Sequence, residues 1–585
     1  MQKIIIIVLF YLFAILLFAF SPVAFAQTTH TITNGSDSAP GSLRDILGGT
    51  LTPGDMIVFD SSVTVIDLTS GQISQSIANL TIAGNDLGVP DALKDALTVL
   101  IADVKLNGVT DLQGKLLTLP YATPTITGTD ERIGITGGGL SITGGLINLT
   151  ATTGTHELSL LTFKDALFSV KTADGTAYTN LTLYGGAIYF EGGVLLDQMT
   201  FLNNTLSAEA GAATSSGAGV LTYGGGGYFG STTSVYNSVF SSNTIKATGG
   251  IAVPNSLTVS AEASGSGGGV YFGGVTDVHD SVFSNNRIYT WGGTASSTTT
   301  SAFADAHTVG GGVCFGDNAT VNNTVFSGNR VDTIGGTAST TSNYSIISAN
   351  AEVLGGGGYF GNEATVHNSV FSDNEVNVTG GTATASDYYA YAHAHALGGG
   401  GYFVGIADIY DTIFSDNTIN ARGGTAVSTS ATTEGDASAL GGGGYFGGYA
   451  YETANIHDTV FSNNRINIWG GTGSMVASKG FGGGGYFSGT ANIFNTMFSG
   501  NAINAIGGTA TGDNASAHVD VSGGGSYFNS TANINDAVFS GNVINATGRT
   551  AIATDALASA YVHASGGEVV LTTRRQLRTP YFQTI

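Results

Sequence analysis

Aspartates that recur beside the core strand of a repeated motif are the first residues in this sequence that could do chemistry. Asp280, Asp411, Asp458 and Asp536 share this position in their copies. Polysaccharide cleavage needs two carboxylates, or a base with a cationic helper, converging on one bond. Calcium binding needs several oxygens on one ion. With two coils per repeat, equivalent carboxylates would lie about 10 Å apart, so we interpret the row as a structural ladder.

Histidines offer a second possible chemistry, metal binding. His279, His367 and His457 occupy one position of the repeat but skip the copies between them. On the two-coil spacing they are about 19 Å apart, which excludes a shared ion. His393 and His395 form an i, i+2 pair on one strand face. That pair could hold a metal weakly, although a plain surface role is favoured.

We therefore predict no catalytic residue, no metal site and no cofactor. Cys314 is the single cysteine, so it cannot form an internal disulfide, and it replaces the Tyr of a repeated motif, where it is expected to pack. Scarce Lys and Arg weaken a lyase mechanism further. Residues 85–180 are the only region where a non-repeating acidic cluster of an enzyme could still lie.

The start of the chain predicts export. Lys3, the apolar run from Ile4 to Phe20 and the small-x-small site Ala24-Phe25-Ala26 form a secretory signal over residues 1–26, with Gln27 the expected mature start. The chain has 18 Lys+Arg against 41 Asp+Glu and a formal charge of −23. Nucleic acid is therefore an improbable partner. The near absence of cysteine in a long exported chain favours a bacterial origin.

A repeat fills residues 181–565 in nine copies. Each copy has a Gly run closed by an aromatic pair, as in Gly355 to Phe360, followed by Phe-x-x-Asn. In eight copies the two Phe residues are 11 apart, and repeat length runs from 37 to 47, most often 43. The Phe and Asn of the second motif are Phe201, Asn204, Phe240, Asn243, Phe283, Asn286, Phe326, Asn329, Phe371, Asn374, Phe414, Asn417, Phe461, Asn464, Phe498, Asn501, Phe539 and Asn542.

These copies predict an all-β fold, a right-handed parallel β-helix. A period of this length indicates stacked units that cannot bury their apolar faces alone. Segments such as Val366 to Phe371 are short, β-branched and bounded by turn residues. Each Phe is expected to stack on the Phe of another repeat, and each Asn to form an amide ladder at a corner. The Gly run suggests positive φ or close approach between turns. We expect two coils per repeat, and one coil plus a protruding loop is the alternative.

Two stretches resemble known families. Gly-Gly-Ala-Ile at residues 185–188, followed by Phe201 to Asn204, resembles the paired repeats of chlamydial-type polymorphic outer membrane proteins, which are autotransporter-like surface adhesins. Later copies depart from that pattern, reading Gly-Gly-Gly-Gly-Tyr-Phe. Residues 32–35, 40–47 and 54–59 are similar to the opening of secreted bacterial β-helix proteins. This second resemblance implies an N-terminal cap, and we assign residues 27–180 to the cap and degenerate coils.

Residues 566–585 break the pattern of the chain before them. They hold Arg574, Arg575 and Arg578 at the point where a tenth Gly run is due. A shifted reading frame permits glycines from residue 566, Phe at residue 571 and the Ser-Val-Phe-Ser-Asp-Asn of residues 369–374 across residues 580–585. We predict that this tail is a tenth repeat read out of frame.

The resemblance implies export, a surface location and adhesion, with no catalytic residues. We expect a non-enzymatic, adhesin- or passenger-like protein that is secreted or held at the outer membrane surface of a Gram-negative-type bacterium. Its expected partners are glycans or proteins of host or neighbouring cells, and membrane association is expected only through a missing C-terminal region. A polysaccharide-processing β-helix enzyme (lyase or glycoside hydrolase) and a structural surface-layer component are the alternatives.

Overall fold

The computed structural model describes most of residues 28–583, and beyond residue 567 only the backbone of short strands. The predicted signal peptide, and residues 87–121 of the predicted degenerate coils, lie outside the described residues. The stretches left out are 1–27, 61, 64, 69–72, 84, 87–121, 124, 136–139, 144–146, 154, 175–179, 214–216, 254–257, 343–344, 448–451, 513–514, 549–550, 553–558, 568, 572–576, 579–580 and 584–585.

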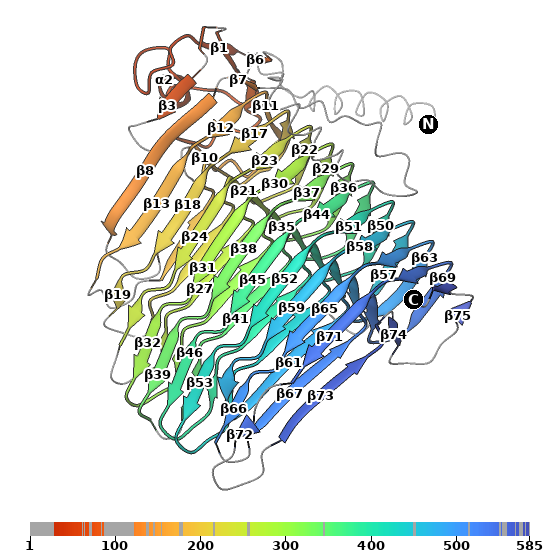
Figure 1. Ribbon diagram of the computed structural model, residues 1–585. Helices are drawn as coiled ribbons and strands as arrows, with labels where there is room; N and C mark the ends of the chain where they lie inside the picture. Colours follow the sequence, from red (N-terminus) through yellow and green to blue (C-terminus); the bar gives the residue numbers. More distant parts are fainter. Residues whose placement is uncertain are drawn as a thin grey trace, which may run out of the picture.

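The fold is a right-handed parallel β-helix, which confirms the predicted class, with successive coils stacked side by side along one axis (Figure 1). The number of coils per repeat differs from our expectation. Strand β30 (Val282–Ser284) pairs in parallel with β37 (Val325–Ser327), and Phe283 lies directly opposite Phe326. One repeat is therefore one coil, and the two-coil interpretation is wrong. Neighbouring repeats are about 4.8 Å apart instead of about 10 Å, so nine of them span roughly 43 Å.

Each coil is flattened into two halves. The half that we call the Phe half contains the strands of the two conserved motifs, and the half that we call the Ala half contains the segment that varies between copies. In one coil the Phe half consists of β30, β35 (Val313–Phe315) and β36 (Ala319–Asn322). The Ala half consists of β31 (Arg287–Trp291), β32 (Thr294–Ser297), β33 (Ala302–Phe303) and β34 (Ala306–Val309).

Two columns of stacked Phe rings fill the Phe half. The rings of Phe371 and Phe414 lie 4.8 Å apart and nearly parallel, and those of Phe360 and Phe403 lie 4.5 Å apart. The two columns meet edge to face, with 6.2 Å between the Phe360 and Phe371 rings. Parallel stacking along the axis and edge contacts across it are both favourable for aromatic quadrupoles. The rings are fully buried.

A buried amide ladder runs beside the Phe columns. The side-chain oxygen of Asn374 accepts from both the backbone N–H and the Nδ2 of Asn329, at 3.1 and 3.0 Å. The Nδ2 of Asn329 also donates to the carbonyl of Phe283. The same pattern joins each Asn of the ladder to the next, because a buried amide must satisfy its hydrogen bonds.

Positive backbone φ explains the recurring aspartates. Asp280, Asp411, Asp458 and Asp536 all have φ between 49° and 52°, at a corner where the other copies mostly carry Asn. Asn and Asp tolerate this left-handed conformation better than other side chains. Asp411 and Asp458 lie on adjacent coils, about 4.8 Å apart, so our spacing argument against a shared ion is wrong. The row nevertheless has a structural cause in the turn.

The two walls of the coil touch at a narrow waist, which a Gly-Gly pair forms in most coils. The N–H of Gly336 donates across the interior to the carbonyl of Ala304, on the preceding coil, at 2.7 Å. A Cβ on Gly336 would lie 2.1 Å from the carbonyl oxygen of Gly293. Only glycine permits walls that meet backbone to backbone. Equivalent bonds join Gly293 to Ala261, Gly381 to Ala349 and Gly424 to Ala392.

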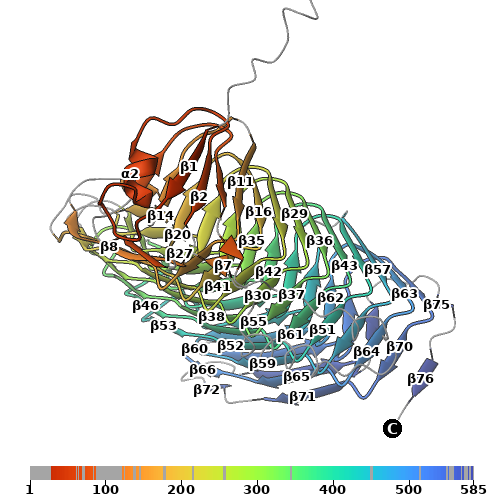
Figure 2. The same cartoon turned by 90° about the horizontal axis from the view of Figure 1, so that it is seen from above.

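A short cap covers the N-terminal end, and the chain ends at the opposite end of the axis (Figure 2). Helix α2 (Leu43–Gly48) begins at Ser42, whose hydroxyl accepts from the N–H of Asp45 and so caps the helix, and the helix buries Leu43 and Leu47. In the tail, β74 (Val569–Leu571) and β76 (Tyr581–Gln583) pair with β68 (Ser526–Phe528) and β70 (Val538–Ser540). The backbone therefore continues in register there, while the out-of-frame origin stays a prediction about the gene.

Candidate binding groove

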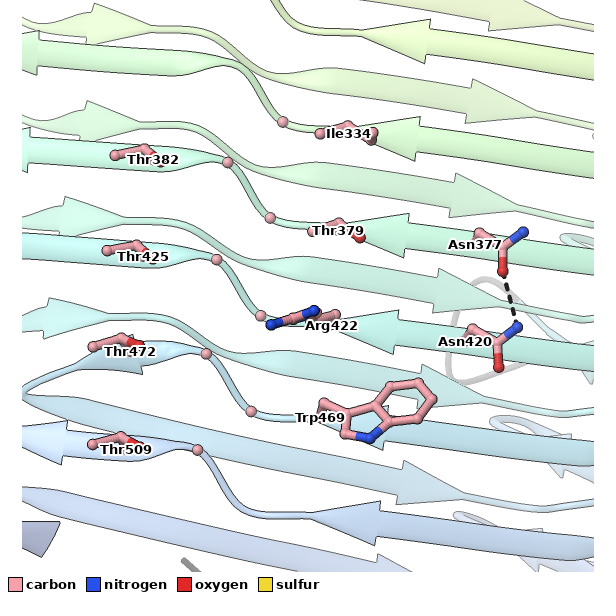
Figure 3. A pocket seen from close by; sticks show the side chains of 18 of the residues that line it. Ile334, Asn377, Thr379, Thr382, Asn420, Arg422, Thr425, Trp469, Thr472 and Thr509 are labelled. Carbon is pink, nitrogen blue, oxygen red and sulfur yellow. Dashed lines mark hydrogen bonds between the residues drawn. The ribbon is translucent and has the colours of Figure 1, made fainter. Parts of the chain in front are cut away.

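The waist produces a groove on the outer surface. Where the Gly-Gly backbone is drawn inward, a hollow of about 840 Å³ crosses successive coils (Figure 3). A second hollow of about 430 Å³ shares Trp291 and Thr337 with it and extends the groove towards the N-terminus. The floor is backbone, because no glycine Cβ covers it.

Two rows of side chains form the rims of the groove. One row is the last residue of each long strand, and strand pairing sets its members side by side, as Figure 3 shows for its middle part. Its members are Trp291, Ile334, Thr379, Arg422, Trp469 and Ile506. The other row follows the Gly-Gly pair and consists of threonines. Its members are Thr337, Thr382, Thr425, Thr472 and Thr509.

Both tryptophans of the chain lie in this rim. The sequence has only two, and the exposed fractions are 57% for Trp291 and 38% for Trp469. Tryptophan is usually well buried, so two exposed copies in one row are informative. They are four coils apart, or about 19 Å along the axis. An exposed aromatic face that nothing in the fold requires is typical of ligand contact.

Amides and one cation add polar groups beside the tryptophans. Asn377 and Asn420 lie in the groove wall, and the Nδ2 of Asn420 donates to the Oδ1 of Asn377 at 2.9 Å (Figure 3). Each amide of this surface ladder keeps a second N–H for a ligand. Among the described residues, Arg422 is the one charged side chain that lines the main hollow, whereas Lys171, Asp174 and Glu209 line the second hollow. The main hollow is thus polar and nearly neutral in a strongly acidic chain.

The histidine row and the cysteine considered in the sequence analysis lie away from the groove. His367 stacks on Tyr410 at 4.6 Å between ring centroids, and His457 stacks on Phe494 at 4.6 Å, all on the outside of the Phe half. His367 and His457 are two coils apart, about 10 Å, so our 19 Å figure was wrong. Cys314 is buried within the column of tyrosines, where burial raises the pKa of its thiol.

The histidine pair has other neighbours than we expected. The ring centroids of His393 and His395 are 5.5 Å apart. The closest carboxylates to His393 come from the next coil, Glu434 and Asp436. Within the part of the chain that the structure describes, His393, Glu434 and Asp436 are the one group of three or more His, Cys, Asp or Glu side chains whose ligand atoms converge.

A sequence signal for the groove exists, although our interpretation of the repeat did not use it. Gly-Gly-Thr recurs at residues 292–294, 335–337, 380–382, 423–425, 470–472 and 507–509. The residue before each of these motifs is one member of the first rim. The recurrence pointed to a conserved bend with a variable exposed neighbour.

Comparison of the chain with models of protein families, with curated proteins and with solved structures finds no match. No helix within the described ranges is long and apolar enough to cross a membrane. The class supported is therefore that of a parallel β-helix built from repeats.

Proposed function

We propose that this chain is an exported, non-enzymatic adhesive solenoid that binds a linear, uncharged glycan along the Gly-Gly groove. The observation that carries the proposal is the placement of both tryptophans, exposed, in one rim of a groove parallel to the axis. A sugar ring has an apolar C–H face that packs on an indole and hydroxyl edges that bond to amides and hydroxyls. A linear glycan repeats these features along its length, as the groove does along the coils.

The charge distribution favours an uncharged polymer. The formal charge of −23 repels polyanions over the whole molecule. Arg422 alone would not offset that repulsion, and its guanidinium can donate to hydroxyl oxygens instead. A glycan chain of several residues would gain affinity from several weak contacts held in series. Surface display on the producing cell, or secretion, would place this groove against glycans of other cells.

Among the residues that the structure describes, no carboxylate lines the main hollow, and Asp174 and Glu209 line its N-terminal extension together with Lys171. Hydrolysis of a glycosidic bond requires a pair of carboxyl groups at a defined separation. An enzyme of the polysaccharide-processing type is the alternative that the experiment must separate from the proposal.

The test is affinity electrophoresis of the purified chain through gels that contain neutral soluble polysaccharides, together with pull-down on insoluble glucans and chitin. We expect retardation by at least one of them, and a loss of about tenfold in affinity for Trp291→Ala or Trp469→Ala, since a buried aromatic anchor contributes roughly 1–2 kcal/mol. Tyr389→Ala is the matched control, because Tyr389 is 38% exposed but lies outside the groove.

Three outcomes would overturn the proposal. Equal loss of retardation in Tyr389→Ala and the tryptophan variants would show a non-specific surface effect. Release of reducing ends from any polysaccharide in the panel would favour the enzyme. Binding of proteins but no glycan would move the adhesive contact from the groove to another face.

A further inference from the structure

Behind the groove, on the opposite face of the waist, the residue that follows the waist residue differs from coil to coil. His393 follows the waist residue Ala392, and Asp436 follows the waist residue Gly435 of the next coil. Because Ala394 pairs with Ala437, His393 and Asp436 are neighbours across adjacent coils. The preceding coil carries Asn350 in this position, and the following one carries Ala477.

The ligand atoms of three side chains converge there. One atom each of His393, Glu434 and Asp436 lies within 4.8 Å of the other two. The Nε2 of His393 is 3.7 Å from a carboxylate oxygen of Glu434. Glu434 and Asp436 also line a hollow of about 350 Å³, which leaves room for further ligands such as water. We propose that His393, Glu434 and Asp436 bind a divalent cation of the zinc type at the surface of the Ala half.

The environment of the imidazole supports a ligand role. The His393 side chain is 15% exposed, and its Nδ1 is buried without a hydrogen-bond partner. The backbone N–H of His393 donates to Asn350 at 2.8 Å, which holds the residue in place.

The two carboxylates, Glu434 and Asp436, complete the set of donors. The backbone N–H of Ala477 donates to Asp436 at 2.7 Å and orients it. One nitrogen and two oxygen donors suit Zn²⁺, whereas Ca²⁺ takes six to eight oxygens. Lys479 competes, since its Nζ lies 3.8 Å from Asp436, but its side chain is half exposed and can move away.

The test is equilibrium dialysis of the purified chain against Zn²⁺, with bound metal measured by elemental analysis and Ca²⁺ as the comparison ion. We expect one Zn²⁺ per chain, a loss of tenfold or more in affinity for His393→Ala and for Asp436→Asn, and a gain for Lys479→Ala. His457→Ala is the control, because His457 is a histidine on the other half that stacks on Tyr410 and Phe494.

Glu434→Gln provides a second variant that keeps the shape of the site. Circular dichroism of each variant establishes that the fold is intact. Zinc binding that is unchanged in both His393→Ala and Asp436→Asn would overturn the proposal, as would a wild-type chain that takes up no Zn²⁺ at micromolar concentration. Equal uptake of Ca²⁺ would show a general acidic surface rather than this site.

Discussion

The Phe half and the Ala half of each coil solve one packing problem with side chains of very different size. In the Phe half, rings such as Phe371 and Phe414 fill a wide interior and stack on the next coil at 4.8 Å. In the Ala half, small side chains such as Ala383 and Ala396 are fully buried between walls whose Cα atoms come within 8 Å. One interior is filled by volume, and the other is closed by bringing the backbones together.

This difference decides what each half tolerates. Large stacked rings fix the spacing and identity of their positions, since a missing ring leaves a cavity. The Ala half depends instead on the absence of side-chain volume at the waist, and its outer positions are free to carry other residues. The groove and the histidine–carboxylate cluster both lie on the outer surface of the Ala half, where sequence can vary without loss of the core.

The comparison is tested most severely at the waist. In Gly381→Ala, the new Cβ would lie 2.1 Å from the carbonyl oxygen of Gly336, and the bond from Gly381 to Ala349 would break. We expect local destabilisation above about 5 kcal/mol, in the exceptional range for a single substitution. Hydrogen exchange should show β46 (Thr382–Ala385) opening while β44 (Val370–Ser372) stays protected.

Gly48→Ala serves as the control for that experiment, because no atom lies within 4 Å of the added Cβ. Exchange in the control should match the wild type. If β44 and β46 exchanged together in Gly381→Ala, the two halves would unfold as one cooperative unit. The two halves would then not differ in what they tolerate.

A second prediction removes side-chain volume from the Phe half and adds side-chain volume to the Ala half. Phe371→Ala should cost about 3–5 kcal/mol, since it leaves a cavity in a ring column. Ala383→Val should cost about 1–3 kcal/mol, because the closed walls must move apart. Hydrogen exchange in the affected coil measures both. A larger cost for Ala383→Val would show that the Ala half is the tighter of the two.

The smallest expected effect concerns charge on the outer face of the Ala half. Asp332 accepts hydrogen bonds from Arg287, Arg330 and Asn377. Burial alone raises the pKa of Asp332, but the bonds from Arg330 and Asn377 outweigh it, so the pKa lies below its usual value. A lowered folded-state pKa gives stability above about pH 4, the unfolded value, that is lost as pH falls.

Asp332→Asn should therefore lower stability at pH 7 by at most about 1 kcal/mol, as for other partly exposed ion pairs. The difference from the wild type should shrink as the pH falls below about 4 and should vanish once the pH is below the lowered folded-state pKa of Asp332, where neither chain carries the charge. Denaturation midpoints at pH 7 and at the lowest pH where the fold persists measure this. A difference that is constant with pH would assign the effect to the amide rather than to the charge.

Much of the Phe half could be predicted from the sequence. Phe-x-x-Asn is a strong pattern because ring stacking and buried amide bonds constrain each position. The Ala half could not be predicted in the same way, since Ala, Ser and Thr carry little information on burial. We took that segment for a second coil, although strand pairs such as Ala383 with Ala426 show that it belongs to the same one.

Whether the candidate sites could be predicted depended on the number of coils per repeat. His393 and Asp436 are 43 residues apart, the commonest repeat length, so one coil per repeat places them side by side. With two coils per repeat, another coil would lie between His393 and Asp436. The sequence therefore suggested only the neighbouring pair His393 and His395 as a possible metal site. The waist bonds could not be predicted, because they join backbone atoms and the Gly-Gly pair is their only sign in the sequence.

The waist also separates the tip of each Ala half from the rest of its coil. The chain between Gly293 and Ala304 is two residues shorter than that between Gly336 and Ala349, and the corresponding repeats are 43 and 45 residues long. The whole difference in repeat length lies in the tip, beyond the waist bond. Since loop-closure entropy rises by only about 0.6 kcal/mol for a doubling of length, each tip can accept inserted sequence without shifting any coil that follows. The molecule thus offers a series of parallel insertion points, one for each coil that has a waist bond, at a fixed spacing of about 4.8 Å.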